Sequence, residues 1–117
     1  MRRRYAPECG DLIWLDFTPQ SGHERAGRRP ALVLSPKAYN AKSQLMLCCP
    51  ITSRVKGYPF EVNVAGGSIT GVVLADQVKS VDWVARHAKF EERVAPEIIE
   101  EVLAKLLVLL GQEPAAE

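Results

Sequence analysis

The sequence predicts a small, mainly β domain, a barrel or sandwich of short strands followed by a C-terminal helix. Several short apolar runs follow one another at close spacing and are separated by stretches rich in Gly and Pro. This pattern is typical of barrels and sandwiches rather than of βαβ sheets. Helical periodicity is clear near the end of the chain, between Pro96 and Gly111.

The first two predicted strands flank a long polar loop. Residues 10–17 alternate apolar side chains between two faces and form the first strand. Residues 18–28 contain Pro, two glycines and no apolar periodicity, so they form a loop. A loop of this length in a small domain is usually functional. The second strand covers residues 29–34, with Pro30 at its start because proline has no N–H for the strand ladder.

A short helix and further strands complete the β region. Ser35-Pro36 predicts a helix N-cap followed by proline at the first helical position, and the helix ends near Asn40. A second basic loop covers residues 52–59. Residues 79–83 either continue the strand before them or form a sixth strand after a bend. The remaining predicted strands cover residues 45–51, 60–64 and 71–78.

The C-terminal helix carries an apolar stripe in its first half and is apolar all round in its last turn and a half. Such a helix end has to be covered on more than one side. The cover is either a groove of the same barrel or a second copy of the chain. We expect one domain over residues 1–117, with residues 112–117 as a frayed tail.

Composition favours a cytoplasmic protein. No apolar segment follows the basic start of the chain, so neither a signal peptide nor a membrane span is expected. The cysteines are odd in number, and adjacent Cys48 and Cys49 in a strand point to opposite faces, which argues against a disulfide framework. His23 and His87 lie far apart and no C-x-x-C is present, so no metal site or cofactor is expected.

Charge is unevenly distributed along the chain. Residues 20–58 contain seven basic side chains and one acid, or +6, although the net charge of the whole chain is +1. This region is suited to a polyanion such as a nucleic acid. A solvated face is the other common meaning of such a charge run.

Four stretches of the chain form an ordered set of motifs: GDLIWLDF at 10–17, AGRRPALVLS at 26–35, PITS with KGYPFEV within 50–62, and GVVLADQVKS at 71–80. Together they resemble the MazF/PemK family of toxin–antitoxin ribonucleases over nearly the whole chain. The resemblance implies an SH3-like β-barrel of the plasmid-maintenance-toxin type with short helices and a C-terminal helix. It also implies a homodimer, sequence-specific, metal-independent cleavage of single-stranded RNA such as mRNA with arrest of translation and growth, and inhibition by a cognate acidic antitoxin.

Cleavage of RNA by its own 2′-hydroxyl needs a proton acceptor, a donor or cation that stabilises the phosphorane, and a proton for the leaving 5′-oxygen. Arg29 stands where the long basic loop meets a strand, and its guanidinium suits a phosphate. Thr52 ends a strand and offers a hydroxyl donor. The resemblance makes both residues catalytic. From the residues alone, Arg29 could merely hold a phosphate and Thr52 could be a turn former.

The general base stays open, because arginine hardly ever deprotonates. His23 and Glu24 in the long loop are the candidates. Many relatives carry a histidine directly before the Arg-Pro step, whereas this chain has Arg28, which adds positive charge to the RNA face.

Further side chains are predicted to hold the RNA. Stacked aromatics beside basic side chains are the usual way of binding a single strand. Phe17 equally suits the core, and Tyr58 also suits packing before Pro59. Asp76 and Gln77 either read base edges or brace the active loop, and we favour bracing. The predicted RNA ligands are Arg25, Arg28, Arg54 and Lys56 for phosphates, and Tyr58 and Phe17 for stacking.

Two other functions compete with the nuclease, since one fold serves several. Toxins that poison DNA gyrase share the fold and rely on a C-terminal Trp-Gly-Ile, whereas this chain ends in Pro-Ala-Ala-Glu. A non-catalytic RNA- or peptide-binding module would keep the basic loops without the pair Arg29 and Thr52. An acidic, partly disordered antitoxin would be attracted to the same basic region and would compete with RNA.

Overall fold

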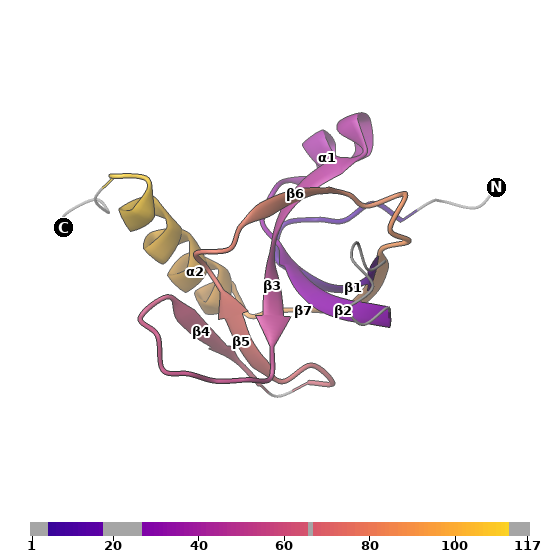
Figure 1. The fold of residues 1–117 in the computed structure, drawn as a ribbon. Helices are drawn as coiled ribbons and strands as arrows, with labels where there is room; N and C mark the ends of the chain where they lie inside the picture. The colour runs from indigo at the N-terminus through magenta and orange to yellow at the C-terminus, as the bar shows by residue number, and fades with distance from the viewer. Residues whose placement is uncertain (1–4, 18–26, 66, 113–117) are drawn as a thin grey trace.

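A strongly curled antiparallel sheet forms the body of the molecule, with one short helix at one end and a longer helix at the C-terminus (Figure 1). The structure is a computed structural model that describes residues 5–17, 27–65 and 67–112. The strand order is β4-β5-β3-β2-β1-β7, and β6 pairs with β3 off this path. The elements are β1 (Asp11–Phe17), β2 (Gly27–Val33), α1 (Lys37–Ser43), β3 (Leu45–Thr52), β4 (Glu61–Val64), β5 (Gly71–Leu74), β6 (Lys79–Asp82), β7 (Lys89–Arg93) and α2 (Pro96–Leu109).

Strand β3 is the centre of the sheet. One edge pairs with β2, and the other edge is divided between two strands. Residues 45–48 pair with β6, and residues 51–52 pair with β5. The sheet therefore bends along β3, and its two halves enclose separate cores.

Alternation along the strands assigns side chains to the two cores. Leu12 packs in one core while Ile13 and Leu15 pack in the other. Cys49 and Cys48 divide in the same way, which confirms that adjacent cysteines of the strand point to opposite faces. The predicted mainly β fold with a C-terminal helix is confirmed.

The short helix differs from its prediction. α1 begins after Pro36, whose φ of −75° and ψ of 154° are extended, and it runs to Ser43 rather than ending near Asn40. Ser35 does not cap the helix. Its hydroxyl instead donates to Asn40 Oδ1 at 2.6 Å and accepts from the Leu47 N–H at 2.8 Å. Ser35 therefore connects α1 to β3. A buried hydroxyl needs hydrogen-bond partners, and here Asn40 and Leu47 supply them.

Two strand assignments are settled by pairing between distant segments. β6 is a separate strand, because residues 75–78 turn the chain away from β5 and onto the first half of β3. β7, with the sequence KFEER, was not predicted, since it lacks apolar alternation. It forms because it pairs with β1. Buried Asp11 strengthens this pairing, since its carboxylate accepts from Arg93 at 3.0 Å and from the Tyr5 hydroxyl at 2.6 Å.

Helix α2 is buried along part of its length only. Val102 is fully buried, and Ile98 and Ile99 pack on the same core. The last turn is uncovered, with Val108 at 56% and Leu110 at 64% exposure. The barrel's own groove therefore does not cover the apolar end of the helix. Residues 113–117 of the predicted tail lie outside the described residues, and among the described helices none has the length and hydropathy to cross a membrane.

We expect Val102→Ala to lower the free energy of unfolding by about 1–3 kcal/mol, because it leaves a cavity beneath α2. Urea unfolding at one fixed protein concentration measures this. Val55→Ala is the matched control, since Val55 is 61% exposed and its truncation should change stability by less than about 0.5 kcal/mol. Equal effects of both variants would contradict the packing described for α2.

Candidate functional site

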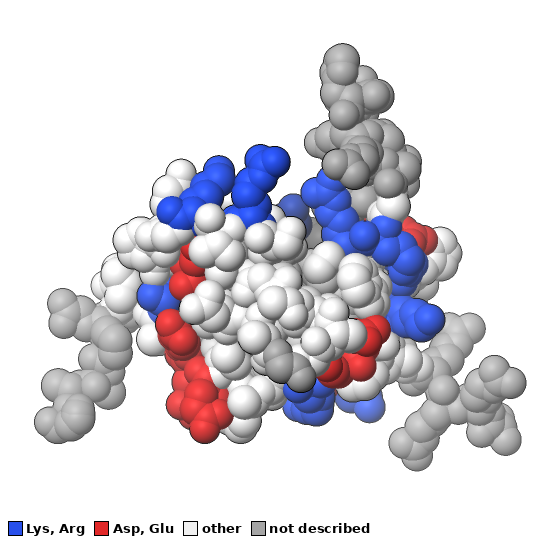
Figure 2. Space-filling model, turned by 90° about the horizontal axis from the view of Figure 1, so that it is seen from below, with Lys and Arg blue, Asp and Glu red and all other residues white. Residues whose placement is uncertain are grey.

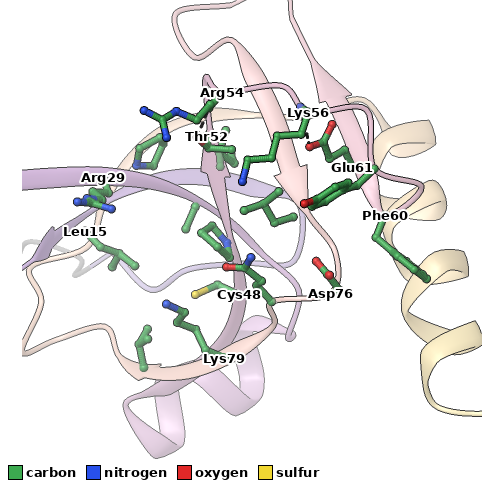
Figure 3. Close-up of a pocket in the computed structure, with 18 of the residues that line it drawn as sticks. Leu15, Arg29, Cys48, Thr52, Arg54, Lys56, Phe60, Glu61, Asp76 and Lys79 are labelled. Atoms are coloured by element: carbon green, nitrogen blue, oxygen red, sulfur yellow. Dashed lines mark hydrogen bonds between the residues drawn. The ribbon is translucent and has the colours of Figure 1, made fainter.

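A cleft of about 400 Å³ opens where β2, β3 and the loop after β3 meet the turn between β5 and β6 (Figure 3). Its floor is apolar and its walls carry most of the predicted site. Two predicted catalytic residues and three predicted phosphate or stacking ligands share the cleft with two residues of the turn between β5 and β6. The predicted site residues that line it are Arg29, Thr52, Arg54, Lys56, Tyr58, Asp76 and Gln77.

Strand register brings Arg29 and Thr52 together although 22 residues separate them in the sequence. β2 pairs with β3 so that Ala31 lies opposite Pro50. The pairing ends at this pair, and Arg29 and Thr52 each lie two residues beyond it, so the alternation of side chains along a strand puts them on the same face as Ala31 and Pro50. Both side chains line the cleft.

Thr52 is held in place from two sides. Its Oγ1 accepts a hydrogen bond of 3.1 Å from the Arg54 N–H, so it begins a turn as one interpretation predicted. This bond leaves the hydroxyl hydrogen able to donate. Gly71 of β5 passes so close that an added Cβ would lie 2.3 Å from the Thr52 carbonyl oxygen. Only glycine at position 71 permits this approach.

The loop at residues 53–59 overhangs the cleft. Glu61 at the start of β4 accepts hydrogen bonds from the Lys56 and Gly57 N–H groups, both at 3.0 Å. Lys56 Nζ lies 5.7 Å from the centre of the Tyr58 ring. Tyr58 is 57% exposed, so it is presented on the surface rather than packed. In Figure 3, Lys56 extends over the cleft from one side and Arg29 lies across from it.

Lys79 and Arg86 also line the cleft, and sequence reasoning missed both. With Arg29, Arg54 and Lys56 they make five basic side chains, against the two acids Glu61 and Asp76. Only Lys79 lay within a recognised motif, GVVLADQVKS. Figure 2 shows several basic side chains along the upper edge of one face and acids at its lower left and lower right, with further basic side chains at its lower edge.

Arg28 lies outside this cleft and lines a second hollow of about 700 Å³. Its guanidinium pairs with Asp16 and donates to the Trp14 carbonyl at 3.2 Å and the His87 carbonyl at 2.9 Å. The hydrogen bond from His87, with the charge of Arg28, holds the pKa of Asp16 below its usual range. Arg28 therefore has a structural role where the end of β1 meets the start of β2. Arg29, Thr52 and Arg54 line both hollows, together with Pro30 and Ile51, and we call this shared boundary the ridge.

Asp76 and Gln77 present exposed side chains to the cleft. Neither side chain makes a hydrogen bond to another described residue, so the bracing contacts that we favoured are not among the described interactions. His23, Glu24 and Arg25 lie outside the described residues, as does the side chain of Phe17.

Neither a cysteine nucleophile nor a cluster of metal ligands is found among the described residues of the cleft. Cys48 lines the cleft, but burial raises the pKa of its thiol to about 11, so the thiol is protonated at neutral pH and is a poor nucleophile. Within residues 5–17, 27–65 and 67–112, no three side chains of His, Cys, Asp or Glu are grouped as metal ligands.

Comparison with known proteins places residues 8–110 in a family described as PemK-like, MazF-like toxins of type II toxin–antitoxin systems. The chain is 54% identical over 111 residues to the endoribonuclease toxin MazF of Escherichia coli K12, covering 95% of this chain and all of that protein. It is 36% identical to endoribonuclease PemK of Escherichia coli, covering 94% of this chain and 86% of PemK. A MazE–MazF crystal structure from Deinococcus radiodurans matches with a TM-score of 0.88 and 54% identity, over 92% of this chain and 98% of that one.

Gly71→Ala should lower the free energy of unfolding by about 1–3 kcal/mol, because its methyl group overpacks against the Thr52 backbone. Urea unfolding measures the loss. Gly67→Ala is the control, since the atoms nearest to an added Cβ there are the carboxylate end of the Glu92 side chain, which can rotate away. If Gly71→Ala were no more destabilising than Gly67→Ala, the close approach of β5 to Thr52 would be wrong.

Proposed function

The chain belongs to the PemK-like, MazF-like family of toxins from type II toxin–antitoxin systems, and we propose that it cleaves single-stranded RNA at the ridge formed by Arg29 and Thr52. The enzyme is an endoribonuclease toxin, as its curated relatives are. The observation that carries the site assignment is that two separate strands place these residues on one face, inside a basic cleft. In the cell the reaction destroys mRNA and so arrests translation and growth.

The position of the ridge supports internal cleavage. Arg29, Thr52 and Arg54 separate the two hollows and belong to both. A strand whose phosphate lies on the ridge can extend in both directions, so cutting needs no chain end. Single-stranded substrate is favoured, because unstacked bases can enter hollows that a duplex cannot.

The proposed reaction uses the substrate's own nucleophile. The 2′-oxygen forms a bond to phosphorus, the bond between phosphorus and the 5′-oxygen breaks, and the products are a 2′,3′-cyclic phosphate and a 5′-hydroxyl. Arg29 stabilises the charge that gathers on the non-bridging oxygens, and the Thr52 hydroxyl donates to one of them. Lys56 and Arg54 hold neighbouring phosphates, with Tyr58 as a stacking surface.

The proton from the 2′-hydroxyl needs an acceptor other than arginine. We retain Glu24 and His23 as the candidates for proton transfer, in the long loop that leads into β2. Phe17 and Arg25 remain proposed RNA ligands because the sequence places an aromatic and a basic side chain beside this loop. Arg28 is the weakest of the proposed ligands, because Asp16 and two carbonyls already engage its guanidinium.

The nuclease is favoured over the two alternatives. A gyrase poison or a passive binding module would not need an arginine and a threonine together on one face of a basic cleft. The curated relatives that cover nearly the whole chain are endoribonucleases.

An acidic antitoxin is the proposed inhibitor. The Deinococcus radiodurans MazF structures include complexes with MazE. In this chain the five basic side chains of the cleft would attract an acidic segment, which would then exclude RNA by competition.

We further propose that the enzyme is a homodimer. The last turn of α2 leaves Leu107, Val108, Leu109 and Leu110 exposed. Residues 106–111 carry no charge, and a contiguous apolar helix end on a small domain is typical of a protein interface. A second copy is the proposed cover.

The central experiment is cleavage of a long RNA of mixed sequence by the purified protein in excess EDTA, followed by mapping of the 5′ ends. We expect cuts within one short recurring sequence. Arg29→Ala should lower kcat/KM by about 10²–10³-fold, the effect of removing one preorganised donor to a developing anion.

Lys42→Ala is the control, because Lys42 lies on α1 outside both hollows and its loss removes the same charge. Activity that requires a divalent metal would refute the metal-independent mechanism. Cleavage retained in Arg29→Ala would keep the nuclease and move its site. A folded wild-type protein without activity on RNA would leave the gyrase poison and the binding module as the candidates.

Light scattering of the protein alone at micromolar concentration should give the mass of a dimer. Val108→Glu places a charge in the apolar end of α2 and should shift the mass to that of a monomer. Glu101→Gln, on an exposed part of the same helix, should remain dimeric. A monomeric wild type would reject the dimer.

A further inference from the structure

We propose that Glu61 is a positioning residue of the RNA site, which fixes residues 53–59 so that Lys56 and Tyr58 face the substrate. The inference rests on the proposed nuclease function and extends it to a residue that does not touch the reacting phosphate. Glu61 begins β4, at the end of the loop that follows Thr52, and lines the same cleft as Arg29 and Thr52.

Both carboxylate oxygens of Glu61 are used. Oε2 accepts from the Lys56 N–H and Oε1 accepts from the Gly57 N–H, each at 3.0 Å. Two adjacent amides directed at one carboxylate define the orientation of the peptide between them, because hydrogen bonds to a charged acceptor are the stronger kind. Gly57 has a φ of +83°, which lets the chain turn at this point.

The loop has few other anchors. Residues 53–59 are all exposed, so burial contributes little to their order. The Glu61 N–H donates to the Tyr58 carbonyl at 3.2 Å, and Lys105 of α2 donates to the Pro59 carbonyl. These two bonds hold the end of the loop, whereas the Glu61 carboxylate holds its middle, where Lys56 stands.

This arrangement also decides what the Lys56 ammonium does. A glutamate beside a lysine would ordinarily neutralise it, yet the described residues include no ion pair between Glu61 and Lys56. The carboxylate binds the lysine's backbone, and the ammonium lies 5.7 Å from the centre of the Tyr58 ring. In Figure 3 the Lys56 side chain extends over the cleft away from the Glu61 carboxylate. Glu61 thus positions Lys56 without neutralising its ammonium, which stays able to bind the phosphate.

The proposed role of Glu61 can be tested with glutamine, which has nearly the same shape as glutamate. Glu61→Gln retains one acceptor, but its NH₂ faces an N–H and cannot accept from it. Glu61→Ala removes both acceptors. Because the loop binds RNA and does not touch the reacting atoms, the loss should appear in KM and leave kcat nearly unchanged.

The experiment measures steady-state cleavage of a short RNA that contains one cut site mapped with the wild-type enzyme. We expect KM to rise about tenfold for Glu61→Ala and by an intermediate factor for Glu61→Gln, with kcat within about twofold, as loss of charged hydrogen bonds that act on binding predicts. Glu100→Gln, an exposed glutamate of α2, is the charge-matched control and should leave KM unchanged.

A double-mutant cycle separates positioning from general destabilisation. In a Lys56→Ala/Tyr58→Ala background, Glu61→Ala should raise KM no further, because the side chains through which it acts are absent. An additive rise in the triple variant would overturn the proposal, as would an unchanged KM in Glu61→Ala. A fall in kcat at constant KM would also overturn it, by showing that Glu61 acts on the chemical step.

Failure of this inference is distinct from failure of the proposed function. If the wild-type protein cuts RNA and the glutamate variants bind it normally, only the role of Glu61 is lost. If the wild-type protein does not cut RNA, the nuclease assignment and this inference fall together. Urea unfolding of each variant establishes that it is folded before its kinetics are compared, and Glu61→Gln serves should Glu61→Ala not fold.

Discussion

The division of one edge of β3 between two strands is the constraint on which the rest of the structure depends. Its first half pairs with β6 and its second half with β5, so the sheet bends and encloses two cores. The cleft lies at this bend, where the end of β3 meets the first half of β2 and the turn before β6. Gly71 completes the geometry, since its missing side chain lets β5 approach the Thr52 backbone.

The cleft is basic because several acidic side chains of the molecule form hydrogen bonds that hold the structure together. Asp11, Asp16 and Glu61 are held in hydrogen bonds that join strands or anchor loops. The arginines divide into two groups. Arg28 and Arg93 form ion pairs with these aspartates, whereas Arg29 and Arg54 line the cleft. A basic cleft thus survives in a protein whose net charge is only +1, and the local field rather than the total charge would guide a polyanion to it.

Helix α2 links the site to assembly. Its first half packs on a core through Val102, its Lys105 contacts the loop at Pro59, and its last turn is an apolar surface. A partner bound to that last turn would lie near Lys105, which contacts the loop at residues 53–59. The proposed dimer and the proposed RNA site therefore share one helix, which gives a physical reason for a helix end that would otherwise be an aggregation risk in water.

The sequence by itself determined the mainly β class, the first strand, the C-terminal helix and the candidates Arg29 and Thr52, because apolar periodicity and four ordered motifs are local properties of the chain. It did not determine β7, in which Phe90 stands among four charged residues, so that no apolar alternation marks the strand that forms by pairing with β1. Nor could it assign Ser35 to β3, Arg28 to Asp16, or Lys79 and Arg86 to the cleft. Those roles depend on which distant atoms lie within hydrogen-bond reach, and only the register and curvature of the folded sheet decide that distance.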